Sequence, residues 1–137
     1  MTLLLDTGPI VAALNAKDPD HARCAMLIEE AGDLLIPAPV LVEVDYWLLK
    51  LAGPQAWSAF VADIERGAYR LIHPTDGDLK RAAELEQAYH DLDLGLVDAC
   101  IVALCERIGE STLATLDHRH FSVVRPRHCT HLTLLPG

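Results

Sequence analysis

The sequence lacks the features that mark membrane, secreted and nucleotide-binding proteins. No apolar run approaches the roughly 18 residues of a membrane-spanning helix, so no membrane association is expected. The opening MTLLLDTGPI has no basic segment and reaches Asp6 at once, so no secretory signal is expected and the cytoplasm is the predicted location. Gly-x-Gly-x-x-Gly and P-loop motifs are absent, which disfavours a nucleotide-binding Rossmann protein. Without repeats or linkers, the chain is expected to form one domain over residues 1–137.

Basic residues and paired cysteines are also scarce. The chain has 11 Lys plus Arg against 20 Asp plus Glu, and its net charge of -9 argues against a general nucleic-acid coat. None of the four cysteines forms a Cys-x-x-Cys pair, so reduced thiols are expected. A hydrophobic fraction of 51% excludes disorder.

The charge is unevenly distributed along the chain. Residues 118–137 contain no Asp or Glu, but they do contain Arg119, Arg125, Arg127 and four histidines, His118, His120, His128 and His131. An anionic ligand could therefore bind near this stretch, although short basic ends are often only solvated surface. With Cys129 the histidines form close ligand pairs, so zinc is an alternative to histidines that face solvent or phosphate.

Short apolar strands alternate with helices along the whole chain. Strands are expected at 3–5, 34–36, 69–72, 112–116 and 132–135, and helices at 8–15, 19–31, 39–52, 54–66, 76–90 and 96–108. This alternation predicts an α/β protein whose parallel sheet is covered by helices on both faces.

Two acids follow expected strands directly. Asp6 comes after TLLL and Asp117 after TLATL. Ligands of open parallel sheets bind beyond the carboxyl ends of the strands, so both acids are candidates for a shared site. An Asp at this position also commonly caps the next helix, which is the structural alternative.

Further acids lie in or beside apolar helices. Asp98 interrupts LGLVDACIVAL, where a buried carboxylate needs a partner, a proton or a metal, unless the first helical turn satisfies it. Glu43 and Asp45 interrupt PVLVEVDYWLL and lie about equally far from an apolar stripe, so helical periodicity cannot choose between them. The stripe consists of Val40, Leu41, Val44, Trp47, Leu48 and Leu51. If the acids converge, their repulsion requires a cation, and a set of oxygen ligands selects Mg²⁺ or Mn²⁺. The implied chemistry is metal-dependent phosphodiester hydrolysis.

The motifs LLLDTGPIVAAL, PVLVEVDYWL, GLVDACIVALCERIG and TLATLDHRHF together resemble the PIN-domain family over nearly the whole chain. The likeness is greatest to the VapC-type toxins of bacterial toxin–antitoxin pairs. The resemblance implies a three-layer α/β/α sandwich with a central parallel sheet that cleaves RNA with Mg²⁺ or Mn²⁺. It also implies products that end in a 5′-phosphate and a 3′-hydroxyl.

The resemblance also implies roles for individual residues. Asp6, Asp98 and Asp117 would hold the metal, and Glu43, now chosen over Asp45, would complete the cage or orient the attacking water. Thr7 and Thr115 match positions of supporting hydroxyls, whereas Gly8 stands where the family often has Ser. Four residues just past Asp117 are candidates to bind phosphates that flank the cut, namely Arg119, His120, Arg125 and Arg127.

The expected partners are an RNA substrate, a small antitoxin that covers the site, and a second copy of the chain. Two other functions use the same residues. One is a metal-dependent nuclease that acts on DNA or another phosphoester, and the other is a non-catalytic PIN-like binding module.

Overall fold

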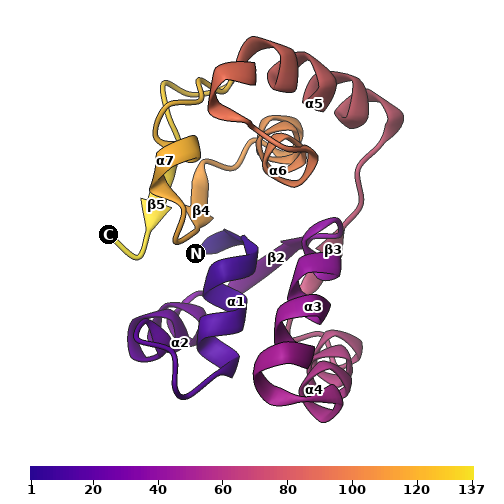
Figure 1. The fold of residues 1–137 in the computed structure, drawn as a ribbon. Helices are drawn as coiled ribbons and strands as arrows, with labels where there is room; N and C mark the ends of the chain where they lie inside the picture. The colour runs from indigo at the N-terminus through magenta and orange to yellow at the C-terminus, as the bar shows by residue number, and fades with distance from the viewer.

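Five short strands form a single parallel sheet in the computed structural model, which describes residues 1–137 (Figure 1). The strands are β1 (Thr2–Leu5), β2 (Asp33–Pro37), β3 (Arg70–Ile72), β4 (Thr112–Ala114) and β5 (Thr133–Leu135). Their order across the sheet is β3-β2-β1-β4-β5, and every neighbouring pair is parallel. The parallel sheet predicted from the alternating pattern is therefore confirmed.

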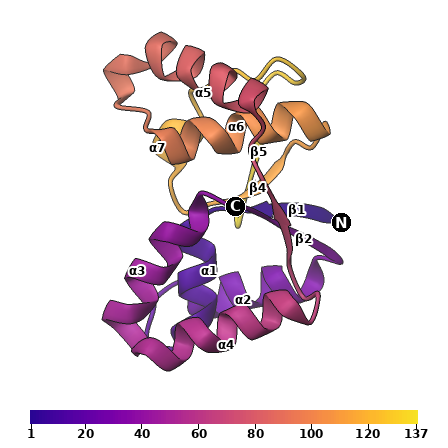
Figure 2. The ribbon, with the colours of Figure 1, turned by 90° about the vertical axis from the view of Figure 1, so that its right-hand side faces the viewer.

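Helices cover both faces of this sheet. They are α1 (Thr7–Leu14), α2 (His21–Glu30), α3 (Val40–Ala52), α4 (Pro54–Glu65), α5 (Asp76–Ala88), α6 (Leu96–Ile108) and α7 (His118–Phe121), with a 3₁₀ turn at His90–Leu92. Figure 2 shows α1 to α4 on one side of the strands and α5 and α6 on the other. The predicted α/β/α sandwich is confirmed. The pattern did not predict α7, because four residues are too few to show a helical period.

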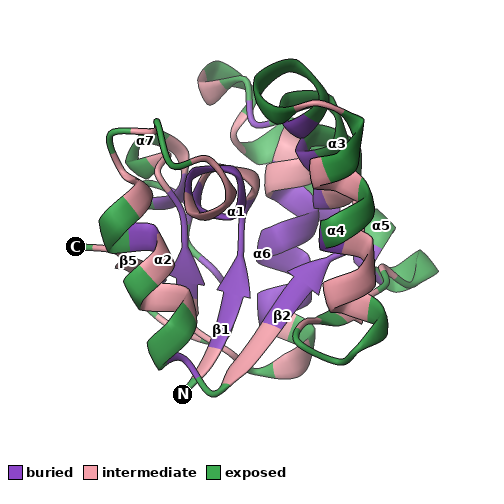
Figure 3. Ribbon diagram, turned by 90° about the horizontal axis from the view of Figure 1, so that it is seen from below, coloured by how far each residue is buried: buried purple, intermediate pink, exposed green.

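The core consists of the strands and the apolar faces packed against them. Leu3, Leu4 and Leu5 are fully buried, as a strand covered on both faces requires (Figure 3). In α6 seven consecutive residues, 99–105, are also buried, which confirms that this helix is apolar all round because it is enclosed. Gly109 ends α6 in the left-handed region, at φ 76°, where glycine carries no steric penalty. All four cysteines are free thiols. No helix combines the length and apolar character needed to cross a bilayer.

Strand order decides where a ligand can bind. β1 is central and pairs with β2 on one side and with β4 on the other. The chain places β2 and β3 on one side of β1 and then crosses to the other side for β4 and β5. In open parallel sheets, such a switch point leaves a crevice beyond the carboxyl ends of the two strands. The pairing of Leu5 with Ala114 brings the residues that follow both strands to this crevice.

Candidate active site

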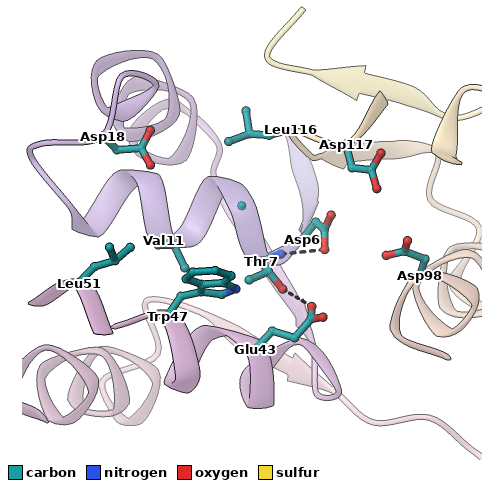
Figure 4. A pocket seen from close by; sticks show the side chains of 11 residues that line it. Asp6, Thr7, Val11, Asp18, Glu43, Trp47, Leu51, Asp98, Leu116 and Asp117 are labelled. Carbon is teal, nitrogen blue, oxygen red and sulfur yellow. Dashed lines mark hydrogen bonds between the residues drawn. The ribbon is translucent and has the colours of Figure 1, made fainter. Parts of the chain in front are cut away.

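A cavity of about 500 Å³ opens at the switch point (Figure 4). Eleven residues line it, and they include Asp6, Glu43, Asp98 and Asp117 but no Lys or Arg. Figure 4 shows these four carboxylates converging, with Asp18 at the other end of the cavity. The structure therefore gathers the four acids that the sequence selected, from β1, α3, α6 and the end of β4, in one place.

Asp6 is the most deeply buried of the four. Its residue exposure is 7%, and its side chain accepts hydrogen bonds from the Thr115 hydroxyl at 2.9 Å and the Thr7 amide at 2.8 Å. Burial, together with the neighbouring carboxylates, raises the pKa of Asp6 to about 6 although both hydrogen bonds lower it. The buried charge of Asp6 therefore has hydroxyl and amide partners but no cationic side chain.

Asp98 lies in the first turn of α6, where backbone amides lack partners within the helix. Its one side-chain hydrogen-bond partner is instead His120, whose Nδ1 lies 2.9 Å from Asp98 Oδ2. Burial, with the charges of Asp117 and Glu43, raises the pKa of Asp98 although the His120 contact opposes it. The structure therefore does not support the alternative in which amides of the first helical turn satisfy Asp98.

Asp117 caps α7 and faces the cavity at the same time. Its Oδ1 accepts the amides of Arg119 at 3.1 Å and His120 at 3.4 Å, whereas its Oδ2 lies 3.1 Å from His120 Nδ1. The Thr115 hydroxyl accepts the Asp117 amide at 3.0 Å and donates to Asp6. Thr115 thus links Asp6, which directly follows β1, with Asp117, which lies beyond the end of β4 at the start of α7.

Glu43 reaches the cavity from α3 as an exposed side chain. Its Oε1 accepts a 2.7 Å hydrogen bond from the Thr7 hydroxyl, and its charge acts on both Asp6 and Asp98. Asp45 does not line the cavity. Of the two acids that helical periodicity leaves open, Glu43 is the one that lines the cavity.

The apolar stripe of α3 is narrower than the sequence suggests. Val40, Val44 and Leu48 are buried, but Trp47 and Leu51 are 44% and 50% exposed and form part of the cavity wall instead of the core. Gly8 lines the same cavity, and a Cβ there would lie 3.3 Å from the Leu116 side chain. A serine in place of Gly8 would therefore require the Leu116 side chain to shift by a few tenths of an ångström.

The four residues expected to bind phosphate take different positions. Arg119 and Arg125 are exposed and do not line the cavity, and the Arg125 amide donates to the Tyr89 hydroxyl. Arg127 is not brought to the acids, because its guanidinium bonds Glu84 and its amide bonds Glu106, which lies near the far end of α6. His120, which the sequence grouped with these arginines, instead contacts two of the acids.

The remaining histidines and Cys129 do not assemble a zinc site. The metal-capable group in this chain is Asp98, Asp117 and His120, whose ligand atoms lie within 4.8 Å of one another. His128 bonds the Glu110 carbonyl and lies 3.7 Å from the Cys129 sulfur, without further ligands. The sequence did contain a signal for His120. A residue three positions after a helix-capping Asp lies on the same side of the helix as that Asp, about one turn further on.

The chemistry of these residues fits a divalent cation. Four carboxylates share a cavity without Lys or Arg, and burial opposes the ionisation of Asp6 and Asp98. A cation among them would offset both the repulsion and the loss of hydration. The arrangement is that of a metal-dependent site on an α/β/α scaffold.

Sequence comparison defines the class of this protein. The PIN-domain family model matches residues 3–125, which include all four acids, and the chain belongs to the PIN-domain family. It is more particularly a homologue of the VapC ribonucleases. The chain is 33% identical to Ribonuclease VapC26 of Mycobacterium tuberculosis over 135 residues, which cover 98% of this chain and 100% of that protein.

Solved structures share the fold at lower sequence identity. VapC20 of M. tuberculosis, described as a Sarcin-Ricin loop cleaving toxin, matches 93% of this chain and 98% of its own with a TM-score of 0.82 and 22% identity. VapBC2 of Rickettsia felis, solved with a DNA fragment from its promoter, matches 98% of this chain and 97% of its own with a TM-score of 0.68 and 22% identity. A toxin–antitoxin complex from Klebsiella pneumoniae matches 89% and 92% with a TM-score of 0.67 and 19% identity. These likenesses concern the fold.

Proposed function

We propose that this protein is a metal-dependent endoribonuclease of the VapC type, the toxin of a toxin–antitoxin pair, and that it acts in the cytoplasm as a single domain over residues 1–137. The observation that carries the proposal is the convergence of Asp6, Glu43, Asp98 and Asp117 in one cavity without Lys or Arg. Full-length similarity to a VapC ribonuclease supports RNA as the substrate. The same evidence disfavours a non-catalytic module, because such a module would not need four acids in a cavity lined by no Lys or Arg.

Asp6, Asp98 and Asp117 would hold the metal, which we propose to be Mg²⁺ or Mn²⁺. When bound, such an ion neutralises phosphate charge and lowers the pKa of a water. The fixed position of Asp6 comes from Thr115 and the Thr7 amide, so this carboxylate is oriented before any ligand arrives. Preorganised ligands lower the cost of assembling the reactive arrangement.

Glu43 has a different environment and a different proposed task. Its carboxylate is exposed and is held on one oxygen by the Thr7 hydroxyl, which leaves the second oxygen free. We assign to this oxygen the orientation of the attacking water and the acceptance of its proton. The cavity wall made by Val11, Trp47 and Leu51 offers apolar surface beside the acids for part of the nucleotide.

Arg119 and Arg125 are proposed to bind phosphates that flank the cut, since both are exposed in the acid-free stretch that follows Asp117. The pairing of Arg127 with Glu84 makes it the weakest of the original candidates. Charge reversal at Arg125 should weaken RNA binding and flatten its salt dependence, because the loss of a phosphate contact lowers the number of counterions that binding releases. An unchanged salt slope would contradict this role.

A small antitoxin and a second copy of the chain are the proposed protein partners. Relatives of the same fold have been solved as toxin–antitoxin complexes, which supports the antitoxin. Helix α3 exposes five apolar side chains, Val42, Tyr46, Trp47, Leu49 and Leu51, of which Trp47 and Leu51 also line the cavity. Several large apolar side chains exposed on one helix are consistent with a protein interface there. Sedimentation of the purified chain over a range of concentrations tests the dimer.

The decisive experiment for the activity uses RNA and DNA oligonucleotides of the same sequence, together with total RNA. We expect RNA cleavage with Mg²⁺ or Mn²⁺, its loss with EDTA, and fragments that carry a 5′-phosphate. Glu43→Gln should abolish cleavage, whereas Asp45→Asn should not, because Asp45 is an exposed acid on the same helix that lies outside the cavity. Faster cleavage of DNA than RNA would replace the proposal with a deoxyribonuclease.

A further inference from the structure

His120 is the one nitrogen donor in the acidic group. Its Nδ1 lies 2.9 Å from Asp98 Oδ2 and 3.1 Å from Asp117 Oδ2, so it sits against two separate carboxylates at once. The two acids come from α6 and from the end of β4, whereas His120 belongs to α7. A side chain of this type at this place is not part of the acid pattern by which the sequence resembles its family.

The spacing of these atoms matches the spacing of metal ligands. Adjacent ligands of an octahedral ion at about 2.1 Å are about 3 Å apart. The two contacts of His120 Nδ1 have this length, and the three ligand atoms fall within 4.8 Å of one another. Three donors at such separations can bind one ion with little rearrangement of the backbone.

The orientation of the ring leaves one nitrogen for this task. The His120 side chain is 15% exposed, and its Nε2 is enclosed by protein, with the backbone of Leu92 next to the ring. Asp117 fixes the first turn of α7 by accepting two of its amides, and this turn carries His120 toward the acids. Without an ion, an Nδ1–H donates to the two carboxylates. A bound ion would replace this hydrogen and leave the neutral ring with its hydrogen on Nε2.

We propose that His120 is a ligand of the metal held by Asp98 and Asp117, and that it makes the site prefer Mn²⁺ to Mg²⁺. The inference rests on the proposed function, since it concerns the same metal. Mg²⁺ is bound almost entirely by oxygen, whereas first-row transition ions gain affinity from imidazole nitrogen. A nitrogen among carboxylates therefore favours Mn²⁺ without excluding Mg²⁺.

A direct test is pulsed electron paramagnetic resonance of the purified protein loaded with Mn²⁺ alone. We expect ¹⁴N modulation from a coordinated imidazole in the wild type and its loss in His120→Gln. The control is His118→Gln, because His118 is an exposed histidine on the same short helix and should leave the signal intact. Absence of ¹⁴N modulation in the wild type, or its persistence in His120→Gln, would overturn the proposal.

Binding calorimetry gives a second readout that does not depend on activity. His120→Gln should bind Mn²⁺ about 10- to 100-fold more weakly, as expected for loss of a ligand or its close support, while its affinity for Mg²⁺ should change less. His120→Asp restores an oxygen donor and should favour Mg²⁺, and its folding is checked by circular dichroism. Equal losses for both ions in both variants would show that His120 only hydrogen-bonds the acids.

Failure of this inference is separable from failure of the proposed function. Metal-dependent RNA cleavage without ¹⁴N modulation would leave the ribonuclease standing and remove His120 from the metal. Strong ¹⁴N modulation in a protein that cleaves no RNA would retain the ligand and remove the ribonuclease.

Discussion

The two ends of α6 carry carboxylates in opposite surroundings. At its first turn, Asp98 joins Asp6, Glu43 and Asp117 in a cavity without Lys or Arg. Near its last turn, Glu106 forms a two-point contact with Arg81, with distances of 2.8 and 3.0 Å. Asp6, Asp98 and Glu106 are all largely withdrawn from water, but only Glu106 has an arginine partner.

This difference has opposite effects on the protonation of the acids. Burial raises the pKa of Asp98, and the hydrogen bond with His120 does not bring this pKa back to its ordinary value. Burial also acts on Glu106, but the hydrogen bond from Arg81 and the Arg127 amide outweigh it and lower the pKa of Glu106. A buried acid without a cation is costly to the fold, and a paired one becomes costly only when its partner is removed. The comparison therefore separates a structural end of α6 from a functional one.

The largest expected effect is on catalysis at the unpaired end. Asp6→Asn removes a charged metal ligand, so metal-dependent RNA cleavage should fall at least about a hundredfold, since metal stabilisation of transition-state charge amounts to several kcal/mol. The variant should fold, because a neutral amide is easier to bury than a carboxylate. Single-turnover cleavage and circular dichroism measure the two effects. Undiminished cleavage by this variant would refute the site assignment.

The next largest effect is on stability at the paired end. Arg81→Leu leaves Glu106 buried without its cation, which should cost about 3 kcal/mol of unfolding free energy, while cleavage per folded molecule stays unchanged. Urea denaturation measures this cost. Arg66→Ala is the matched control, since Arg66 pairs with Asp63 at the surface and should contribute less than about 1 kcal/mol. Equal losses from both variants would mean that burial does not distinguish the two pairs.

The pH dependence of the metal-free protein tests the unpaired acids directly. The pKa of Asp6 is about 6 when folded and near its ordinary 3.8 when unfolded, so the folded state binds more protons between these values. Stability from Asp6 is therefore present at low pH and is lost as the pH rises toward 6, by about 2–3 kcal/mol. Subtracting the Asp6→Asn profile from that of the wild type isolates this contribution. A flat difference between pH 4 and 6 would contradict the burial argument.

The smallest expected effect concerns the hydroxyl that holds Glu43. Thr7→Val removes the 2.7 Å hydrogen bond to Glu43 at an exposed position, so stability should change by less than about 0.5 kcal/mol. Cleavage should fall about 3- to 10-fold, because Glu43 keeps its charge but loses its orientation, and one such hydrogen bond contributes about 1 kcal/mol. Thr2→Val is the control, since its hydroxyl bonds Asp33 at the amino end of β1. Equal activity in both variants would show that Glu43 needs no support.

Local sequence patterns accounted for most of the fold and for the acids. The leucines of β1, the glycine that ends α6 and the acids that follow β1 and β4 carry their information in neighbouring residues. The pattern was less informative for α3, where Trp47 and Leu51 belong to the stripe but stand at a cavity. Apolar periodicity shows which side of a helix avoids water, but it does not show where the neighbouring element stops.

The sequence by itself determined that Asp6 and Asp117 would lie at carboxyl ends of parallel strands, because strand boundaries depend on local chemistry. Tertiary structure alone decided that these strands are neighbours, since β1 and β4 pair across more than a hundred residues. It likewise placed Arg127 on Glu84 and His120 against Asp98. Such contacts depend on the packing of separate elements, and the residues beside each in the sequence do not encode them.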